Sequence, residues 1–396
     1  MQFLKDLLHK HEHHFMKGGK LEKFYPLYEA KESFLFTPRN VTDTTVHVRD
    51  ALDSKRLMIT VVVAMLPCVL FGAYNVGFQE AKAAGETITD IQMFINGMIT
   101  ILPIIITSYA VGGIWEVLFA VTRGHEINEG FLVTGLLFPL TLPPSIPLWQ
   151  VAMGISFGVV VGKEIFGGTG MNVLNPALTA RALLYFSYPV QISGDKVWIL
   201  TNPDKVVDGF SGATALSVAA GTVPGADAGE ALKSFSYSSF DTASLFFGLV
   251  PGSIGETSAL WILVGAALLI LLGVGSWKIM AAVLLGAAVT AFGLNLIASE
   301  SLPGILTLSP TDHILAGGLL FGAVFMATDP VSAARTEMGK WIYGILIGVL
   351  TVLIRVWNPA YPEGAMLAIL FMNIFAPVID HYVVQGNVKR RLSRVS

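Results

Sequence analysis

The chain has 396 residues, of which 53% are hydrophobic and only 13% are charged, and its net charge is −3. Soluble domains carry roughly 25% charged residues, so this chain lacks the polar side chains that a water-facing surface requires. A soluble enzyme and a disordered chain are therefore excluded. The net charge also gives no electrostatic basis for a nucleic-acid partner.

The cysteine content excludes several kinds of covalent and metal site. Cys68 is the single cysteine and lies in an apolar run, which excludes an internal disulfide and a cysteine-based zinc or iron–sulfur centre. The HEHH run at 11–14 fits the solvated face of a surface helix better than a metal site. We therefore expect no metal site of this kind.

Long apolar segments predict an all-α polytopic membrane protein with about ten transmembrane helices, since a crossing needs about 20 apolar residues. The segments at 131–147, which ends in TLPPSIP, and at 174–188 are expected to be broken helices that are buried within the protein. In chain order the segments are 57–78, 94–121, 131–147, 149–166, 174–188, 258–274, 277–298, 312–328, 341–357 and 364–384.

These segments divide the chain into five parts. An N-terminal arm precedes two membrane halves, a polar loop separates the halves, and a basic tail follows them. The loop contains a short apolar piece at 243–250 that suits a re-entrant segment. The parts are 1–56 for the arm, 57–188 and 258–384 for the halves, 189–257 for the loop and 385–396 for the tail.

Charge predicts the orientation in the membrane. An even number of spans puts both termini on one side. Lys55-Arg56 precede the first span and the tail carries four basic residues without an acid, so both termini are expected in the cytoplasm. The 189–241 stretch has three lysines against six acids, which fits the outer side.

A weak internal repeat is visible. NPALTAR at 175–181 follows Phe157-Gly158, and DPVSAAR at 329–335 follows Phe321-Gly322. The repeat fits an internal duplication of a helical scaffold, and it fits equally well two copies of a small-residue packing pattern.

The most specific motif is DGFSGAT at 208–214, which contains Asp208, Ser211, Gly212 and Thr214. Its glycines permit a tight turn, and Ser211 or Thr214 can cap the helix that follows. The motif also places a threonine hydroxyl on a glycine-flexible turn beside an acid. Such a hydroxyl can accept a phosphoester bond.

A second motif is FGGTGMNVLNPAL at 166–178, in which Asn172 and Asn175 precede Pro176. Asparagine before a proline at the first helical turn is typical of a capped helix. Buried asparagine amides also need partners, so a polar ligand is the alternative interpretation.

Acidic residues in apolar segments are candidates for an ion path, because a carboxylate in the bilayer centre costs roughly 2.5–3.5 kcal/mol on insertion scales. Glu116 and Asp380 have apolar residues on both sides, whereas Asp329 precedes a proline and can be a helix cap, and Glu164 can reach the interface from a helix end. For Asp380 the alternative is a surface pair with a basic residue of the tail, Lys389 or Arg390. Arg355 is expected to pair with an acid or a carbonyl.

Gly112-Gly113 lie one turn before Glu116. Paired glycines allow two helices to approach closely, which is the favoured interpretation. The alternative is a wall for a flat ligand.

The motifs together resemble the B subunit of the sodium-translocating NADH:quinone oxidoreductase family. DGFSGAT matches its flavin-attachment signature, and further matches follow in one order over nearly the whole chain. They include HVRD (47–50), VGGIWEVLF (111–119), HEINEGF (125–131), FGGTGMNVLNPAL (166–178), QISGD (191–195), PGSIGE (251–256), FMATDPVSA (325–333), GKWIYGILIGV (339–349) and NPAYPEGAMLAILF (358–371).

The resemblance implies two flavins. FMN would be joined through its phosphate to Thr214 by a separate flavin transferase, within a turn that includes Asp208, Ser211 and Gly212. A non-covalent riboflavin would lie at Asn172 and Asn175, whose amides suit the imide edge of its ring system.

The resemblance also implies the partners and the location. Electrons would pass to ubiquinone while Na⁺ leaves the cytoplasm, in a complex with five other subunits in the bacterial inner membrane. Gly112 and Gly113 would face the quinone, and Glu116, Asp329 and Asp380 would line the ion path. This chain would not oxidise NADH alone.

Three other hypotheses are weighed against this one. The D subunit of the sister ferredoxin:NAD oxidoreductase pump is related, but the long charged arm favours the B subunit of the sodium pump. A solute transporter or channel fits the broken helices but not DGFSGAT. A passive scaffold is disfavoured by the intramembrane acids.

Overall fold

The computed structural model describes residues 6, 9–16, 18–36, 54–124, 127, 129–201, 210–358 and 361–394. Over these residues the chain is helical and contains no strand, which confirms the predicted all-α class. Asp208 lies outside the described residues.

Six helical segments of the described chain are long and apolar enough to cross a membrane, which confirms a polytopic membrane protein. Two shorter apolar helices accompany them, α5 (Gly130–Leu140) and α12 (Ala259–Leu271). The six segments are α3 (Ser54–Ala84), α4 (Asp90–Arg123), Leu148–Phe166, which comprises α6 (Leu148–Val160) and η2 (Glu164–Phe166), α13 (Trp277–Ile297), α16 (Glu337–Trp357) and α17 (Ala365–Leu392).

The two segments that are expected to be broken form short helices. Helix α5 ends at Leu140, and the following residues pair with a second loop: Ile254 donates its N–H to the carbonyl of Leu142 at 3.1 Å, and Gly255 donates to Leu140 at 2.8 Å. Non-helical backbone at membrane depth needs such protein partners. The 174–188 segment forms the 12-residue helix α7 (Pro176–Ser187).

The segment 312–328 is expected from its sequence to be one span, and this expectation is wrong. It forms α14 (Pro310–Leu315), α15 (Leu319–Phe321) and the π-helical turn η4 (Gly322–Met326). The chain turns at Gly317, whose φ of +69° favours glycine. The Arg355 guanidinium donates to the carbonyls of His313 and Ala316 that the break releases. The prediction that Arg355 pairs with an acid or a carbonyl is thus confirmed.

The order of helix neighbours recurs in the two halves. In the first half α4 packs on α6 and α6 on α7, and in the second half α13 packs on α16 and α16 on α17. Contacts between α3 and α12 join the halves. The sequence repeat itself aligns the start of α7 with the turn before α16, so this packing order does not test the duplication.

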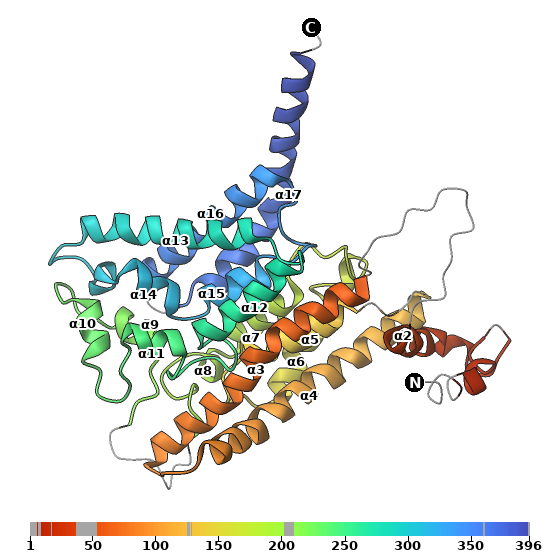
Figure 1. The fold of residues 1–396 in the computed structure, drawn as a ribbon, viewed down its shortest axis with the longest axis horizontal. Coiled ribbons are helices and arrows are strands. Elements are labelled where there is room, and N and C mark those ends of the chain that lie inside the picture. Colours follow the sequence, from red (N-terminus) through yellow and green to blue (C-terminus); the bar gives the residue numbers. More distant parts are fainter. Residues whose placement is uncertain are drawn as a thin grey trace.

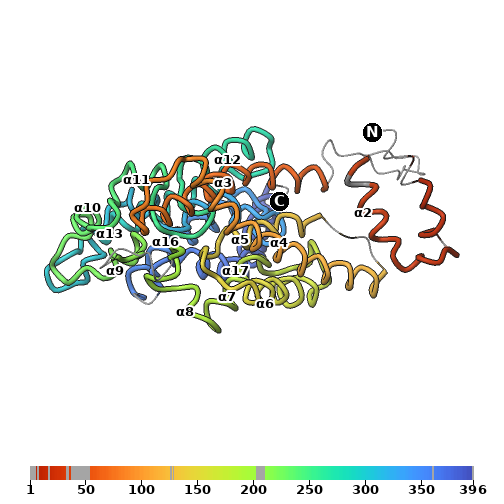
Figure 2. The backbone as a smooth tube through the Cα atoms, turned by 90° about the horizontal axis from the view of Figure 1, so that it is seen from below, coloured from red at the N-terminus to blue at the C-terminus, as the bar shows by residue number. Residues whose placement is uncertain are grey.

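A separate lobe carries Thr214. It consists of the short helices α9 (Ala215–Ala220), α10 (Ala228–Lys233), α11 (Thr242–Phe247) and η3 (Gly304–Thr307) around its own apolar core, which includes Leu216, Leu232 and Phe240. In Figures 1 and 2 this green lobe lies at one end of the long axis, and the red arm with α2 (Tyr25–Leu35) lies at the other.

Candidate cofactor and ion sites

Thr214 is the N-cap of α9. Its Oγ1 accepts a hydrogen bond from the backbone N–H of Ser217 at 3.3 Å, so the capping interpretation of the motif is confirmed. The preceding turn passes close to another segment, because a Cβ on Gly212 would lie 2.6 Å from the carbonyl oxygen of Asp195. Only glycine fits there. Ser211 is half-buried in the same turn.

Thr214 also opens onto a cavity of about 410 Å³, which we call the outer cavity. Two tyrosines form part of its wall, Tyr185 on α7 and Tyr361 after α16, with ring centroids 4.4 Å apart. The other lining residues are Arg181, Ile192, Ser193, Gly194, Trp198, Ser217, Ala220, Gly221, Pro362 and Glu363. The threonine thus combines its capping role with access to a space that can hold a ligand.

A buried ion-pair group forms another part of this wall. The Arg181 guanidinium bonds the carboxylate of Glu363 and lies 3.3 Å from a carboxylate oxygen of Glu256. Arg181 and Glu256 are buried. One cation against two carboxylates leaves an excess of negative charge beside the outer cavity when both acids are ionised.

Asn175 caps α7: its Oδ1 accepts from the N–H groups of Ala177 at 3.0 Å and Leu178 at 3.3 Å. Asn172 donates to the carbonyl of Leu174 at 2.9 Å. The capping interpretation is confirmed for Asn175, and both amides already bond their own turn.

Asp329 forms a similar turn in the other half. Its carboxylate accepts from the N–H of Val331 at 3.2 Å and from the Ser332 hydroxyl at 2.7 Å. The Asn172-to-Asn175 turn and the Asp329 turn line one cavity, the inner cavity, of about 80 Å³. The two halves of the sequence repeat therefore converge in space.

Asn373 of α17 links the two turns. Its Oδ1 accepts from the N–H of Asn175 at 3.4 Å, and its amide nitrogen donates to the carbonyl of Ser332 at 3.2 Å and to the Tyr343 hydroxyl at 2.9 Å. Sequence reasoning missed this residue. The available signal was a lone asparagine within the apolar segment 364–384.

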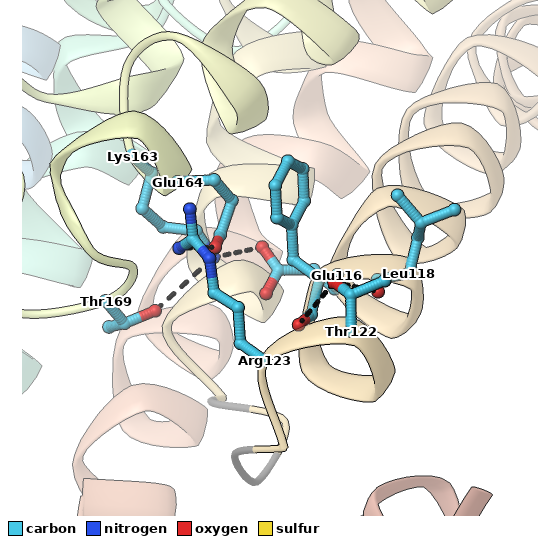
Figure 3. A network of polar contacts seen from close by, with 8 residues as sticks. Glu116, Leu118, Thr122, Arg123, Lys163, Glu164 and Thr169 are labelled. Atoms are coloured by element: carbon cyan, nitrogen blue, oxygen red, sulfur yellow. Dashed lines mark hydrogen bonds and ion pairs between the residues drawn. The ribbon is translucent and has the colours of Figure 1, made fainter. Parts of the chain in front are cut away.

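A charge cluster lies beside the inner cavity (Figure 3). Lys163 bonds Glu116, and its ammonium lies 3.4 Å from the carboxylate of Glu164 and 3.3 Å from the Thr169 hydroxyl. Arg123, at the end of α4, pairs with Glu164 at 3.1 Å. Lys163, Glu116 and Glu164 are only 4%, 4% and 1% exposed. The idea that Glu164 reaches the interface is therefore wrong.

Asp380 receives three hydrogen bonds from the start of α16. The N–H groups of Arg335 and Thr336 donate at 2.7 and 3.0 Å, and the Thr336 hydroxyl donates at 2.5 Å. A surface pair with Lys389 or Arg390 is the alternative to an ion site. The structure supplies neutral hydrogen-bond donors instead, and the basic residue whose charge acts on this carboxylate is Arg335.

Gly112 and Gly113 differ in their surroundings. A Cβ on Gly112 would lie 2.4 Å from the Phe131 ring, whereas one on Gly113 would lie 3.9 Å from it. The close-packing interpretation holds for Gly112.

Comparison with known proteins identifies the family of this chain. A family model described as the NQR2, RnfD, RnfE family matches residues 41–389. The chain belongs to this family. The B subunit of Na⁺-translocating NADH-quinone reductase from Chromohalobacter salexigens is 52% identical, over 99% of this chain and 96% of its own length.

Other relatives carry the same subunit name. Proteins of that name from Pseudomonas aeruginosa PAO1 and Azotobacter vinelandii are 50% and 51% identical, each over 99% of both chains. The resemblance to the B subunit is confirmed by these relatives.

Within this family member, tertiary structure groups the candidate residues into three places. Thr214 lines the outer cavity and follows the turn of Ser211 and Gly212, Asn172, Asn175 and Asp329 line the inner cavity, and Glu116 lies in the adjoining charge cluster. Asp380, on α17, lies apart from these three places and bonds the start of α16. Sequence reasoning did not single out Arg181, Lys163 and Tyr361 as site residues. The available signal was a basic residue or a tyrosine next to apolar residues.

Proposed function

We propose that this chain is the membrane-embedded B subunit of a sodium-translocating NADH:quinone oxidoreductase and carries FMN as a phosphoester on Thr214. The observation that supports it most directly is the position of the Thr214 hydroxyl on the wall of the outer cavity, in a member of this family. FMN supplies reversible electron transfer when bound. The chain's own residues supply the attachment hydroxyl, the aromatic wall and the close turn at Gly212.

The outer cavity fits such a group by its size and by the chemistry of its lining. Its volume of about 410 Å³ lies within the range of small-molecule pockets, about 300–1,000 Å³. Tyr185, Trp198 and Tyr361 provide aromatic surface for a flat ring system. We place this lobe on the periplasmic side, because the 189–241 stretch carries more acids than lysines.

The inner cavity is our proposed site for riboflavin. Asn172, Asn175, Thr169 and Lys163 line it with hydrogen-bonding groups. Its present volume of about 80 Å³ holds a few water molecules rather than three fused rings, so its walls must separate to admit the ring system. The α3 residues Leu57 and Met58 and the loop residues Val274 and Gly275 form walls that would have to move apart.

Ubiquinone and Na⁺ complete the proposal. The arm and the end of α4 enclose a space of about 1,100 Å³ lined by Phe15, Met16, Phe24 and Tyr25 among others. The aromatic part of this wall, which Lys20, Glu22 and Lys23 accompany, suits a quinone ring better than Gly112, which is packed against Phe131. For Na⁺ we propose the carboxylates of Asp329 and Asp380, whose hydrogen bonds come from neutral donors, with Glu116 as a further member of the path. The positive charge of Arg335 also acts on Asp380.

The complex would place this chain with five other subunits, the A, C, D, E and F subunits, in the bacterial inner membrane. Both termini would lie in the cytoplasm, and a flavin transferase would be required for maturation. Lys55-Arg56 and the basic tail support this orientation.

Intact-mass measurement of the protein, produced with the transferase, tests the FMN attachment. We expect the native chain and a Ser211→Ala control to be heavier than their sequences by one FMN, and Thr214→Ala to have the sequence mass. The alanine removes the acceptor oxygen and costs about 0.5–2 kcal/mol as a lost cap, so the complex should still assemble. A flavin mass that persists in Thr214→Ala would place the bond elsewhere.

A further inference from the structure

Lys163 places a positive charge on an acid of the proposed sodium path. Its ammonium bonds the carboxylate of Glu116 and lies 3.4 Å from that of Glu164, and the lysine is only 4% exposed. A sodium ion needs the same partners, because a hard cation binds the oxygen atoms of carboxylates. The ammonium therefore occupies the position that Na⁺ would take at Glu116.

The charge cluster is balanced as it stands. Among the described residues, the carboxylates of Glu116 and Glu164 face the ammonium of Lys163 and the guanidinium of Arg123, which pairs with Glu164 at 3.1 Å. Adding Na⁺ to these four groups would leave one positive charge in excess, and an uncompensated charge in a buried place is costly. Na⁺ can thus bind Glu116 only when the ammonium moves away.

The inner cavity can receive this ammonium. Lys163 lines the cavity, and its ammonium already lies 3.3 Å from the hydroxyl of Thr169, a half-buried residue that lines it too. A water-sized group needs roughly 10–15 Å³ of such space, so a cavity of about 80 Å³ admits an ammonium group. The carboxylate-bearing Asp329 lines the same cavity. Because a lysine has a flexible four-carbon stem, its ammonium can turn from Glu116 into this space.

The cluster is also within reach of the surface. Arg123 stands at the end of α4 with 38% of its side chain exposed, and it pairs there with the buried Glu164. On another side of Glu164 the chain passes as a glycine loop, since a Cβ on Gly168 would lie 3.7 Å from the carboxylate. An ion that enters beside Arg123 therefore meets Glu164 and Glu116 with little protein in between.

We propose that Lys163 is a tethered counter-cation, whose ammonium holds the sodium position at Glu116 and gives it up to Na⁺ by turning into the inner cavity. The inference rests on the proposed sodium path through Glu116. The lysine stays protonated and no covalent bond changes, so the exchange replaces one cation by another. Lys163 thereby makes the occupancy of the inner cavity and that of the sodium position depend on each other.

The first test compares Lys163→Gln with Lys278→Gln in the whole complex. Both variants lose a lysine that bonds a glutamate, but Lys278 pairs with the exposed Glu337. At about pH 8, where a free carboxyl is ionised, Lys163→Gln should lower the sodium concentration for half-maximal quinone reduction about tenfold, because Na⁺ no longer has to replace a charged hydrogen bond. Lys278→Gln should leave that concentration unchanged. A lysine that only stabilises the fold predicts no such gain in sodium affinity.

Lys163→Arg keeps the positive charge and shifts the sodium dependence in the opposite direction. A guanidinium binds a carboxylate through two parallel N–H groups, so it should hold Glu116 more firmly than an ammonium does. We expect a several-fold higher sodium concentration for half-maximal quinone reduction. If Lys163→Gln does not assemble, this variant decides, and an unchanged sodium dependence in Lys163→Arg overturns the inference.

Thermal unfolding gives a readout that does not depend on turnover. A ligand that binds only the folded protein raises its melting temperature with concentration. In NaCl, compared with equal choline chloride, the stabilisation of Lys163→Gln should reach half its maximum at about tenfold less Na⁺ than in the native complex. The stabilisation of Lys163→Arg should require more Na⁺ than the native complex does.

Glu116→Gln separates the two proposals. If this variant leaves the sodium dependence unchanged, the path through Glu116 fails and the lysine inference fails with it. If it weakens the sodium dependence while Lys163→Gln leaves the required sodium concentration unchanged or raises it, the path stands and the lysine inference is overturned.

Discussion

The outer and inner cavities differ in how far their polar groups are already used. The outer cavity measures about 410 Å³, and the hydroxyl of Tyr361, which is buried in its wall, has no partner among the described residues. In the inner cavity Asn172, Asn175 and Asp329 bond their own turns, and the space measures about 80 Å³. The outer cavity can admit a ligand at its present volume, whereas the inner cavity must first rearrange.

The two regions also balance buried charge differently. At the outer cavity one guanidinium, Arg181, serves Glu256 and Glu363. Beside the inner cavity the two acids Glu116 and Glu164 share two cations, Lys163 and Arg123. Removing one cation should therefore do more damage in the outer region, and this difference can be measured.

The largest expected effect follows from Arg181→Leu. It leaves two carboxylates beside the outer cavity without the cation that bonds them, and breaking a buried pair in this way costs about 3–5 kcal/mol. We expect little assembled complex, measured by size-exclusion chromatography. Combining it with Glu256→Gln and Glu363→Gln should restore assembly. Assembly at the native level by Arg181→Leu alone would contradict a structural role for this group.

Lys163→Leu should be less damaging than Arg181→Leu, because Arg123 still pairs with Glu164. Thermal unfolding of the two single variants in the same detergent gives the comparison. Equal losses would show that the sharing of cations does not matter for stability, and the contrast between the two regions would be lost.

Gly112→Ala and Gly113→Ala form a matched pair on α4. The added methyl group meets the Phe131 ring at 2.4 Å in the first case and at 3.9 Å in the second. Overpacking costs typically 1–3 kcal/mol, so Gly112→Ala should lower the melting temperature by several degrees and Gly113→Ala should not. The reverse order would indicate that Gly113 faces a ligand or a partner rather than open space.

The smallest expected effect concerns sodium. Asp329→Asn and Asp380→Asn keep the size of the side chain and remove a negative charge that neutral donors hold in place. Each should raise the sodium concentration for half-maximal quinone reduction several-fold without changing the flavin content. Asp312→Asn, on α14 next to the lobe that carries Thr214, serves as the control. An unchanged sodium dependence with a lower melting temperature would leave Asp380 as an anchor for α16 only.

Much of the fold follows from local sequence. A run of apolar residues as long as the bilayer is thick has few alternatives to a helix, because every backbone group must be paired without water. The 312–328 segment departs from this rule. Its helix breaks at Gly317, and Arg355, from another helix, takes the released carbonyls. The sequence predicted that Arg355 would find an acid or a carbonyl but not which one.

By itself the sequence determined the membrane class, the all-helical architecture, the turn that exposes Thr214 and the family, because each depends on composition or on residues that are neighbours in the chain. Only the tertiary structure decided that Lys163 pairs with Glu116, that the Asn175 and Asp329 turns share one cavity, and that Tyr361 lines the cavity of Thr214. Whether a buried polar group is paired depends on atoms brought together from separate helices, and no local pattern records that distance.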